Sequence, residues 1–376
     1  MKDEFTVNEL QALKACFTDA IYFRNMLVYI SELKECGLLI NGFMSEVSMF
    51  VIESYDCLVK IAPEVKLLFD TVSIEALRKS RHRAKILEYT KDINSGLNYL
   101  SLIDIKQTKF FQIHNTSLFC KLKQFIQPDM GITKYRGHFI TTTHSTVFDM
   151  GPDAKIESEY FFSIGEVIRI YLQTIIENFE IDEVSCNSDY VFSKNDYQIL
   201  DIKSKSLFKR SNFQESNKRF APALILILVR LNYTKMITSQ FLSKNSHTLI
   251  RLKFINIYHA CQSLTKIQSL VMKGAPTENE IMFFKTIFSN KNVKWLLTQT
   301  SLRNLFVHYL LDKKQLKRMP DNYTREEAIY ILSGGLSFED LEKILDITIE
   351  NITIQIESFY KLNNNTFWIN KINNEL

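Results

Sequence analysis

The sequence predicts a mainly α-helical protein, and three observations lead to this class. Only 10 Gly and 6 Pro occur among 376 residues, and these two residue types are the usual breaks in turn-rich β folds. Apolar residues recur at helical spacing through long parts of both halves of the chain. Hydrophobic residues make up 46% of the chain and charged residues 23%, which suits a globular protein with a packed core.

We expect a helical N-terminal module over residues 1–127 and interpret it as a sensor or specificity unit. Helical spacing of apolar residues begins in 8–35, with Asn8 as a candidate N-cap. The same pattern continues through 43–61 and 64–100. The sequence contains no visible internal repeat.

Residues 128–156 differ in composition and are expected to form a linker or extended segment between two domains. They contain three of the ten glycines, and residues 139–143 are Phe-Ile-Thr-Thr-Thr. Aromatic and β-branched residues favour extended structure over helix.

The C-terminal half is expected to be a helical bundle over residues 157–360, followed by a polar tail over 361–376. Thr277 and Glu280 have the spacing of a capping box, which predicts a helix start there. Successive amphipathic helices with short connections are typical of a bundle. Helices are predicted over 157–179, 218–242, 246–272, 278–289, 292–312 and 338–360.

The cysteine pattern and the hydropathy favour a soluble, cytoplasmic protein without membrane contact. Six cysteines lie far apart and form no Cys-x-x-Cys pair, so neither a zinc ribbon nor a disulfide framework is expected. The first ten residues carry charges and lack the apolar segment of a signal peptide. Residues 221–229 form the most apolar run, which is about half of a membrane span and is interpreted as a buried helix.

The motifs of several enzyme classes are missing from the sequence. It contains no G-x-x-x-x-G-K-[ST], G-x-G-x-x-G, H-E-x-x-H or G-x-S-x-G pattern. P-loop nucleotide hydrolysis, dinucleotide redox chemistry, zinc proteolysis and serine hydrolysis are therefore not expected. Neither a metal ion nor a cofactor is predicted.

A helical wheel of the predicted helix over 292–312 divides its side chains into two faces. Asn304 and His308 lie one turn apart on the face away from the core, and Arg303 lies at its edge. Val307 falls between them, and an apolar residue on an outer face predicts contact with a second subunit. The alternative is a solvated face with one exposed valine. The opposite, core-facing stripe consists of Leu302, Leu305, Phe306, Tyr309 and Leu310.

The string Arg-Asn-Leu-Phe-Val-His over residues 303–308 resembles the R-x4-H signature of the HEPN superfamily, with Asn304 directly after the arginine. Domains of this superfamily are helical bundles that commonly dimerise through the motif helix. Many members are metal-independent ribonucleases of toxin–antitoxin, abortive-infection or CRISPR-associated systems. The resemblance covers about residues 155–360. It implies a homodimer in a prokaryotic defence or toxin system, with an antitoxin or another defence-system protein as a further partner.

The resemblance also implies roles for the motif residues. His308 would be the acid–base group, Arg303 would stabilise phosphate charge, and Asn304 would orient the histidine or the phosphate. These residue types suit RNA cleavage by the ribose 2′-OH, because histidine titrates near neutral pH and arginine offers a bidentate cation. Some family toxins carry a modifiable Tyr two positions after the histidine. Here that position is Leu310, so neutralisation by tyrosine modification is not expected.

Four basic residues follow the motif helix and are predicted to hold an RNA backbone: Lys313, Lys314, Lys317 and Arg318. The alternative is that they favour the C-terminal end of a helix for reasons of its dipole. Two further basic runs, over 78–85 and 203–210, are either solvated faces or nucleic-acid contacts.

The leading hypothesis is a metal-independent endoribonuclease that cleaves RNA with Arg303 and His308 at a dimer cleft. The alternative is a non-catalytic HEPN module that binds RNA or a protein. A third interpretation is a structural helical protein that matches the short pattern by chance.

Overall fold

The protein is mainly α-helical, with one small three-stranded sheet in the part of the chain that is described. This confirms the predicted fold class. The predicted polar tail is described only as far as Leu362. The computed structural model describes residues 5–69, 74–75, 78, 93–112, 128–150, 158–177, 192–242 and 246–362.

Three N-terminal and central helices pack against one another. They are α1 (Val7–Glu32), α2 (Leu39–Ile61) and α7 (Ser158–Glu177). Short 3-10 turns, Lys34–Cys36 and Pro63–Leu68, follow α1 and α2.

The N-cap of α1 is Thr6 and not the predicted Asn8. The Thr6 hydroxyl accepts a hydrogen bond from the backbone N–H of Glu9, and the Glu9 carboxylate accepts one from the backbone N–H of Thr6. Asn8 instead connects distant parts of the chain, since its Oδ1 accepts a hydrogen bond from the backbone N–H of Leu311 at 3.0 Å.

The residues predicted as a linker form part of a sheet and a helix. β1 (Met130–Tyr135) lies between β2 (His138–Thr142) and β3 (Tyr197–Ile202), and both pairings are antiparallel. The helix α6 (Thr143–Met150) packs against β1 and β2, and α4 (Ile93–Gln112) packs against α6. The prediction of extended structure is confirmed for the strands. The prediction of a linker is wrong, because the side chains of β1, β2 and α6 are mostly buried.

The C-terminal half is built from a succession of helices, among which α11 and α17 are the longest. One turn of π-helix, Thr234–Thr238, joins α9 to α10. Short 3-10 turns lie at Lys194–Asp196 and Glu215–Phe220. The remaining helices are α8 (Ser204–Lys209), α9 (Ala221–Tyr233), α10 (Ser239–Phe241), α11 (His247–Met272), α12 (Glu278–Ser289), α13 (Lys291–Thr298), α14 (Thr300–His308), α15 (Lys313–Leu316), α16 (Arg325–Ser333) and α17 (Phe338–Phe359).

Helix α9 lies in the centre of the molecule, as its apolar sequence predicts. The continuous stretch Glu215–Phe241 is the one helix in the described ranges that is long and apolar enough to cross a membrane. Of its most apolar window, 78% is buried inside the protein. A core helix of a globular protein has this property.

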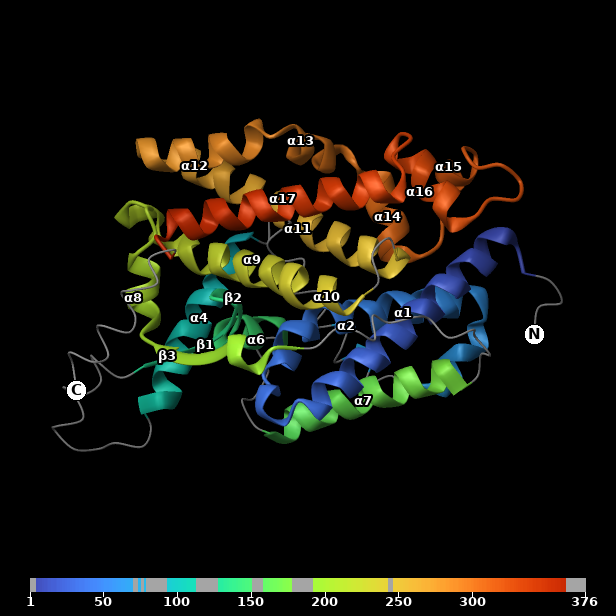
Figure 1. Cartoon of the computed structure of the whole chain (residues 1–376), viewed down its shortest axis with the longest axis horizontal. Helices are drawn as coiled ribbons and strands as arrows, with labels where there is room; N and C mark the ends of the chain where they lie inside the picture. The colour runs from blue at the N-terminus through green and yellow to red at the C-terminus, as the bar shows by residue number, and fades with distance from the viewer. Residues whose placement is uncertain are drawn as a thin grey trace.

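Two adjoining hydrophobic cores hold the fold together, and both draw residues from distant parts of the chain. One core joins Leu97 and Ile103 of α4 to α9, α11 and α17. The other joins α1, α2 and α7 to Tyr233 and Tyr309. Figure 1 shows α1, α2 and α7 along one long side of the molecule and α12, α13 and α17 along the other. The predicted split into an N-terminal module and a separate bundle is therefore wrong, because the two parts share their cores.

Gly42 of α2 lies against the aromatic ring of Tyr233, and a Cβ added there would overlap the ring carbons. We expect Gly42→Ala to lower the free energy of unfolding by about 1–3 kcal/mol, since overpacking a filled core costs this much. Gly165→Ala in α7 is the matched control, because its Cβ would meet nothing within 4 Å. That variant should raise the free energy by about 0.5–1 kcal/mol. Chemical denaturation measures both, and equal effects of the two variants would contradict the packing.

Candidate functional site

The motif residues lie on a short helix, because the predicted helix over 292–312 is interrupted twice. Gln299 separates α13 from α14 with φ −84° and ψ 47°. Tyr309 ends α14 with a positive φ of 64° and a ψ of −43°. The helical wheel therefore describes the side-chain directions only within Thr300–His308. Tyr309 lies outside the helix and does not continue its apolar stripe.

His308 is the last residue of α14, and a buried carboxylate holds its ring. Its Nδ1 lies 2.7 Å from Oε2 of Glu53 in α2. The Glu53 side chain is only 3% exposed, whereas that of His308 is 41% exposed. The imidazole thus has one nitrogen directed at a buried acid and a large part of its ring at the protein surface.

Arg303 and Asn304 lie on the same helix and contact each other. Nη1 of Arg303 donates a hydrogen bond to Oδ1 of Asn304 at 3.0 Å. Both side chains are half-buried, as is His308. Asn304 and His308 are one helical turn apart and therefore lie on the same side of α14. All three predicted residues belong to this short helix, and Glu53 of α2 contacts His308.

Val307 is completely buried, which overturns its predicted place at a dimer interface. Its exposed fraction is 0%, and it belongs to the hydrophobic core that also contains Leu302 and Phe306. Helix α14 packs between α2, α11 and α16 of the same chain. The wheel missed this because it treats one side of the helix as the core, whereas α14 is covered from several sides.

The predicted RNA-binding cations are exposed and lie beyond the end of α14. Lys313 and Lys314 form the first turn of α15, whose N-cap is Asp312. Lys317 and Arg318 follow, and Arg318 donates a hydrogen bond to the carbonyl of Ile331 at 3.1 Å. Since a new helix begins at Lys313, the dipole at the C-terminal end of the motif helix does not account for these lysines.

The other two basic runs give weaker indications of a nucleic-acid contact. Of residues 78–85 only Arg78 is described. Its guanidinium donates a bidentate pair of hydrogen bonds to the two carboxylate oxygens of Asp56, at 2.9 and 3.1 Å. In the run over 203–210, Lys203 pairs with buried Asp129 at 3.0 Å.

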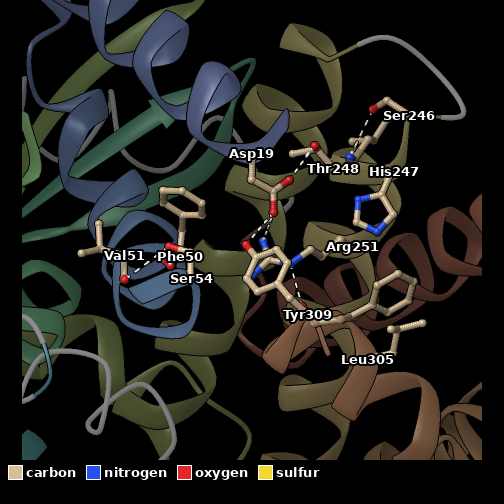
Figure 2. Close-up of polar contacts among 12 residues, drawn as sticks. Asp19, Phe50, Val51, Ser54, Ser246, His247, Thr248, Arg251, Leu305 and Tyr309 are labelled. Carbon is tan, nitrogen blue, oxygen red and sulfur yellow. Dashed lines mark hydrogen bonds and ion pairs between the residues drawn. The ribbon is translucent and has the colours of Figure 1, made fainter. Parts of the chain in front are cut away.

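A buried polar cluster that sequence reasoning did not find fixes the end of α14 (Figure 2). Arg251 of α11 and Asp19 of α1 are both 0% exposed, and their Nη1 and Oδ2 atoms lie 2.9 Å apart. The hydroxyl of Tyr309 donates to the same Asp19 oxygen at 2.6 Å. Thr248 donates to the other Asp19 oxygen, also at 2.6 Å. The guanidinium carbon of Arg251 lies 4.6 Å from the centre of the Tyr309 ring, within cation–π range.

Two arginines from different helices bind the backbone carbonyls at the end of α14. Nε of Arg251 donates to the carbonyl of Phe306 at 2.6 Å. Arg325 of α16 donates to the carbonyl of Leu305 at 3.0 Å and to that of Tyr309. The carbonyl of Leu305 also accepts a hydrogen bond from the backbone N–H of Tyr309, and the two arginines add charged donors to this last turn, where helical partners run out. These cations fix the end of α14 and, with it, the position of His308.

His247 completes this cluster as a neutral acceptor. Burial lowers the pKa of His247 well below its usual value, and the charges of Arg325 and Arg251 lower it further. Its Nε2 accepts a hydrogen bond from Nε of Arg325 at 3.2 Å. Burial also lowers the pKa of Arg325 to about 10, at which the guanidinium remains charged at neutral pH.

The structure contains a second histidine–glutamate pair, between the sheet and α17. Nδ1 of His138 lies 2.7 Å from Oε1 of Glu357, and the His138 side chain is 33% exposed. His138 lies on the sheet, away from the R-x4-H string, and makes the same type of contact as His308. A substitution of His138 can therefore be compared with one of His308.

Within the described ranges no group of three or more His, Cys, Asp and Glu residues could hold a metal ion. Comparison of the chain with protein-family models, with curated proteins and with solved structures finds no match.

Asp19→Ala would leave the guanidinium of Arg251 buried without its carboxylate. We expect the free energy of unfolding to fall by about 3–5 kcal/mol, the range for a broken buried ion pair. Glu166→Ala is the matched control, because Glu166 pairs with Arg169 while both side chains are more than half exposed. This control should unfold close to wild type. Chemical denaturation separates the two, and a near-wild-type Asp19→Ala would contradict the importance assigned to the cluster.

Proposed function

We propose that this protein is a HEPN-type, metal-independent endoribonuclease of a prokaryotic defence or toxin system. The observation that carries the proposal is the contact of Glu53 with Nδ1 of His308, at 2.7 Å, beside Arg303 and Asn304 on one helix. A buried carboxylate at one ring nitrogen orients an imidazole and stabilises its protonated form, which is the arrangement of many acid–base histidines.

The reaction that these groups suit is the attack of a ribose 2′-OH on the adjacent phosphorus. The bond from phosphorus to the 5′ oxygen breaks, which leaves a 2′,3′-cyclic phosphate and a 5′-hydroxyl. One proton leaves the 2′-OH and one is delivered to the 5′ oxygen. Because Nδ1 of His308 faces Glu53, Nε2 is the ring atom assigned to proton transfer.

Arg303 is assigned to the negative charge that develops on the phosphate. Asn304 accepts one of its N–H groups at 3.0 Å, and the guanidinium has further donors for phosphate oxygens. The exposed cations of α15 and the turn after it would hold the RNA backbone on the C-terminal side of the motif.

We place the proposed site within a single chain. Val307, the residue expected at the contact of two motif helices, is buried in its own chain. The substrate in this proposal is RNA, the location is the cytoplasm, and an antitoxin or another defence-system protein would control the activity.

Tyrosine modification does not fit as the control mechanism. Tyr309, next to His308, is 0% exposed, and its hydroxyl donates to Asp19. Burial also raises the pKa of its hydroxyl well above the usual value. A modifying enzyme has no access to this group in the folded protein.

Cleavage of total RNA in the presence of EDTA tests the enzyme proposal. We expect wild type to release fragments with 2′,3′-cyclic phosphate ends. His308→Ala and Arg303→Ala should each lose about 100-fold or more in rate. Glu53→Gln should lose about 10- to 100-fold, since it removes the orienting acid and leaves the imidazole in place. His138→Ala is the matched control and should keep the wild-type rate.

Two outcomes would change the assignment. Unchanged cleavage by folded His308→Ala would end the catalytic proposal. Tight RNA binding without cleavage by wild type, reduced in Arg303→Ala, would favour the alternative, a non-catalytic RNA-binding module.

The lysines after the motif helix give a separate test of the RNA-binding surface. We expect replacement of Lys313, Lys314 and Lys317 by Ala to weaken RNA binding and to lower the slope of log affinity against log salt by about 2. The control replaces three exposed lysines of α12 and α13 by Ala: Lys285, Lys291 and Lys294. Fluorescence anisotropy at several salt concentrations measures the slopes, and equal slopes for the two triple variants would contradict this surface.

A further inference from the structure

Helix α2 packs tightly against the end of α9 at Gly42. A Cβ at this position would overlap the ring of Tyr233, so a glycine is what lets the two helices come this near. Tyr233 is the last residue of α9, and the single turn of π-helix Thr234–Thr238 follows it directly. Single π-helical turns inside helices often mark functional positions. Glu46 lies one helical turn after Gly42, on the same side of α2, and reaches this turn.

Glu46 places a carboxyl group in the interior, where its hydrogen-bond partners are neutral side chains. The residue is only 3% exposed. Its Oε1 accepts a hydrogen bond from Nδ2 of Asn256 in α11 at 2.7 Å, and its Oε2 accepts one from the hydroxyl of Thr238 at 3.4 Å. Nδ2 of Asn256 also donates to the hydroxyl of Thr234 at 2.8 Å. Glu46 thus connects α2 to both ends of the π-helical turn, directly at one end and through Asn256 at the other.

No cation in the described ranges forms an ion pair with Glu46. The cations on the neighbouring elements contact other carboxylates: Arg251 pairs with Asp19, Arg230 with Asp149 and Lys235 with Glu350. Burial raises the pKa of Glu46 to about 7, and its hydrogen bonds and the charge of Arg251 offset only part of this rise.

A small hollow lies beside the contact between Glu46 and Asn256. It has a volume of about 30 Å³, and its polar lining includes Ser45, Arg230, Asn256 and His259. A polar space of this size admits at least one water molecule. Water in this hollow can hydrate a charge on Glu46 from the side of Asn256.

We propose that Glu46 is a proton-operated latch between α2 and the π-helical turn. In the protonated form, Oε2 donates to the hydroxyl of Thr238 while Oε1 accepts from Asn256, and the turn is held against α2. In the ionised form, a buried carboxylate without a cation needs hydration, which pulls it toward the hollow and loosens the turn. The proposal does not rest on the ribonuclease function, because Glu53 and His308 form a separate contact.

The latch predicts that stability falls as the pH rises toward neutrality. The pKa of Glu46 is about 7 in the folded protein, against a usual value of 4.5. Between these two values the folded protein keeps the proton and the unfolded chain has lost it. Each unit of pH within this window therefore raises the unfolding constant by about tenfold, and the stabilisation by the proton is lost above the pKa of the folded form.

Glu46→Gln isolates this contribution, because the amide keeps the shape and the hydrogen bonds of the protonated carboxyl group and does not ionise. Chemical denaturation at about pH 5 and about pH 8 gives the unfolding constants of both proteins. The ratio of wild type to Glu46→Gln should rise by roughly 70-fold between the two conditions. Glu32→Gln is the matched control, because Glu32 is exposed at the end of α1. It should keep the pH dependence of wild type.

Amide hydrogen exchange shows where the structure loosens. Protection factors of residues 237–242 should be equal in wild type and Glu46→Gln at about pH 5 and about tenfold or more lower in wild type at about pH 8. Amides of α12, which does not contact Glu46, should be protected equally in both proteins. Carbon-13 NMR of the carboxyl groups in wild type measures the titration of Glu46 even if the variant does not fold.

Three results would overturn the proposal. One is a ratio of unfolding constants that does not change with pH. Another is equal protection of residues 237–242 in wild type and Glu46→Gln at about pH 8. The third is a wild type in which every glutamate carboxyl group titrates near its usual pKa.

Discussion

Arg251 of α11 and Asp19 of α1 form an ion pair with no exposure to solvent, and the arrangement around α14 depends on it. A charge removed from water is tolerated only if its partners compensate for the lost hydration. Arg251 has three such partners: the Asp19 carboxylate, the carbonyl of Phe306 and the ring of Tyr309. One side chain thus connects the first helix of the chain to the end of the motif helix.

This connection explains why the N-terminal helices belong to the same folding unit as the C-terminal bundle. Asp19 accepts a hydrogen bond from Tyr309, which lies 290 residues away in the sequence. Glu53 contacts His308, which lies 255 residues away. Arg325 adds a second cation at the neighbouring carbonyls of Leu305 and Tyr309, beside a histidine that burial keeps neutral. The motif helix is therefore held at its C-terminal end from three directions, and an accurately held imidazole is what acid–base chemistry needs.

Much of the helical architecture follows from local sequence, whereas the site does not. The apolar run over 221–229 predicts the buried α9, and the spacing of Thr277 and Glu280 predicts the capping box that begins α12. The spacing of apolar residues does not indicate the break at Gln299 or the positive φ of Tyr309. Nothing in the local sequence indicates that Arg251 is buried, because only its distant partners make a buried arginine favourable. The prediction that Val307 lies on an outer face is wrong for a related reason. A helical wheel assumes one buried side, whereas α14 is covered by α2, α11 and α16 together.

The central claim is that Glu53 holds Nδ1 of His308, and the ring tautomer of His308 tests it most directly. In protein with ¹⁵N-labelled histidine, at a pH where this ring is neutral, nitrogen chemical shifts distinguish a proton on Nδ1 from one on Nε2. The account predicts Nδ1–H in wild type, donating to the carboxylate of Glu53, and loss of this preference in Glu53→Gln, whose amide can donate to Nδ1. A His308 ring with its proton on Nε2 in both proteins would contradict the account.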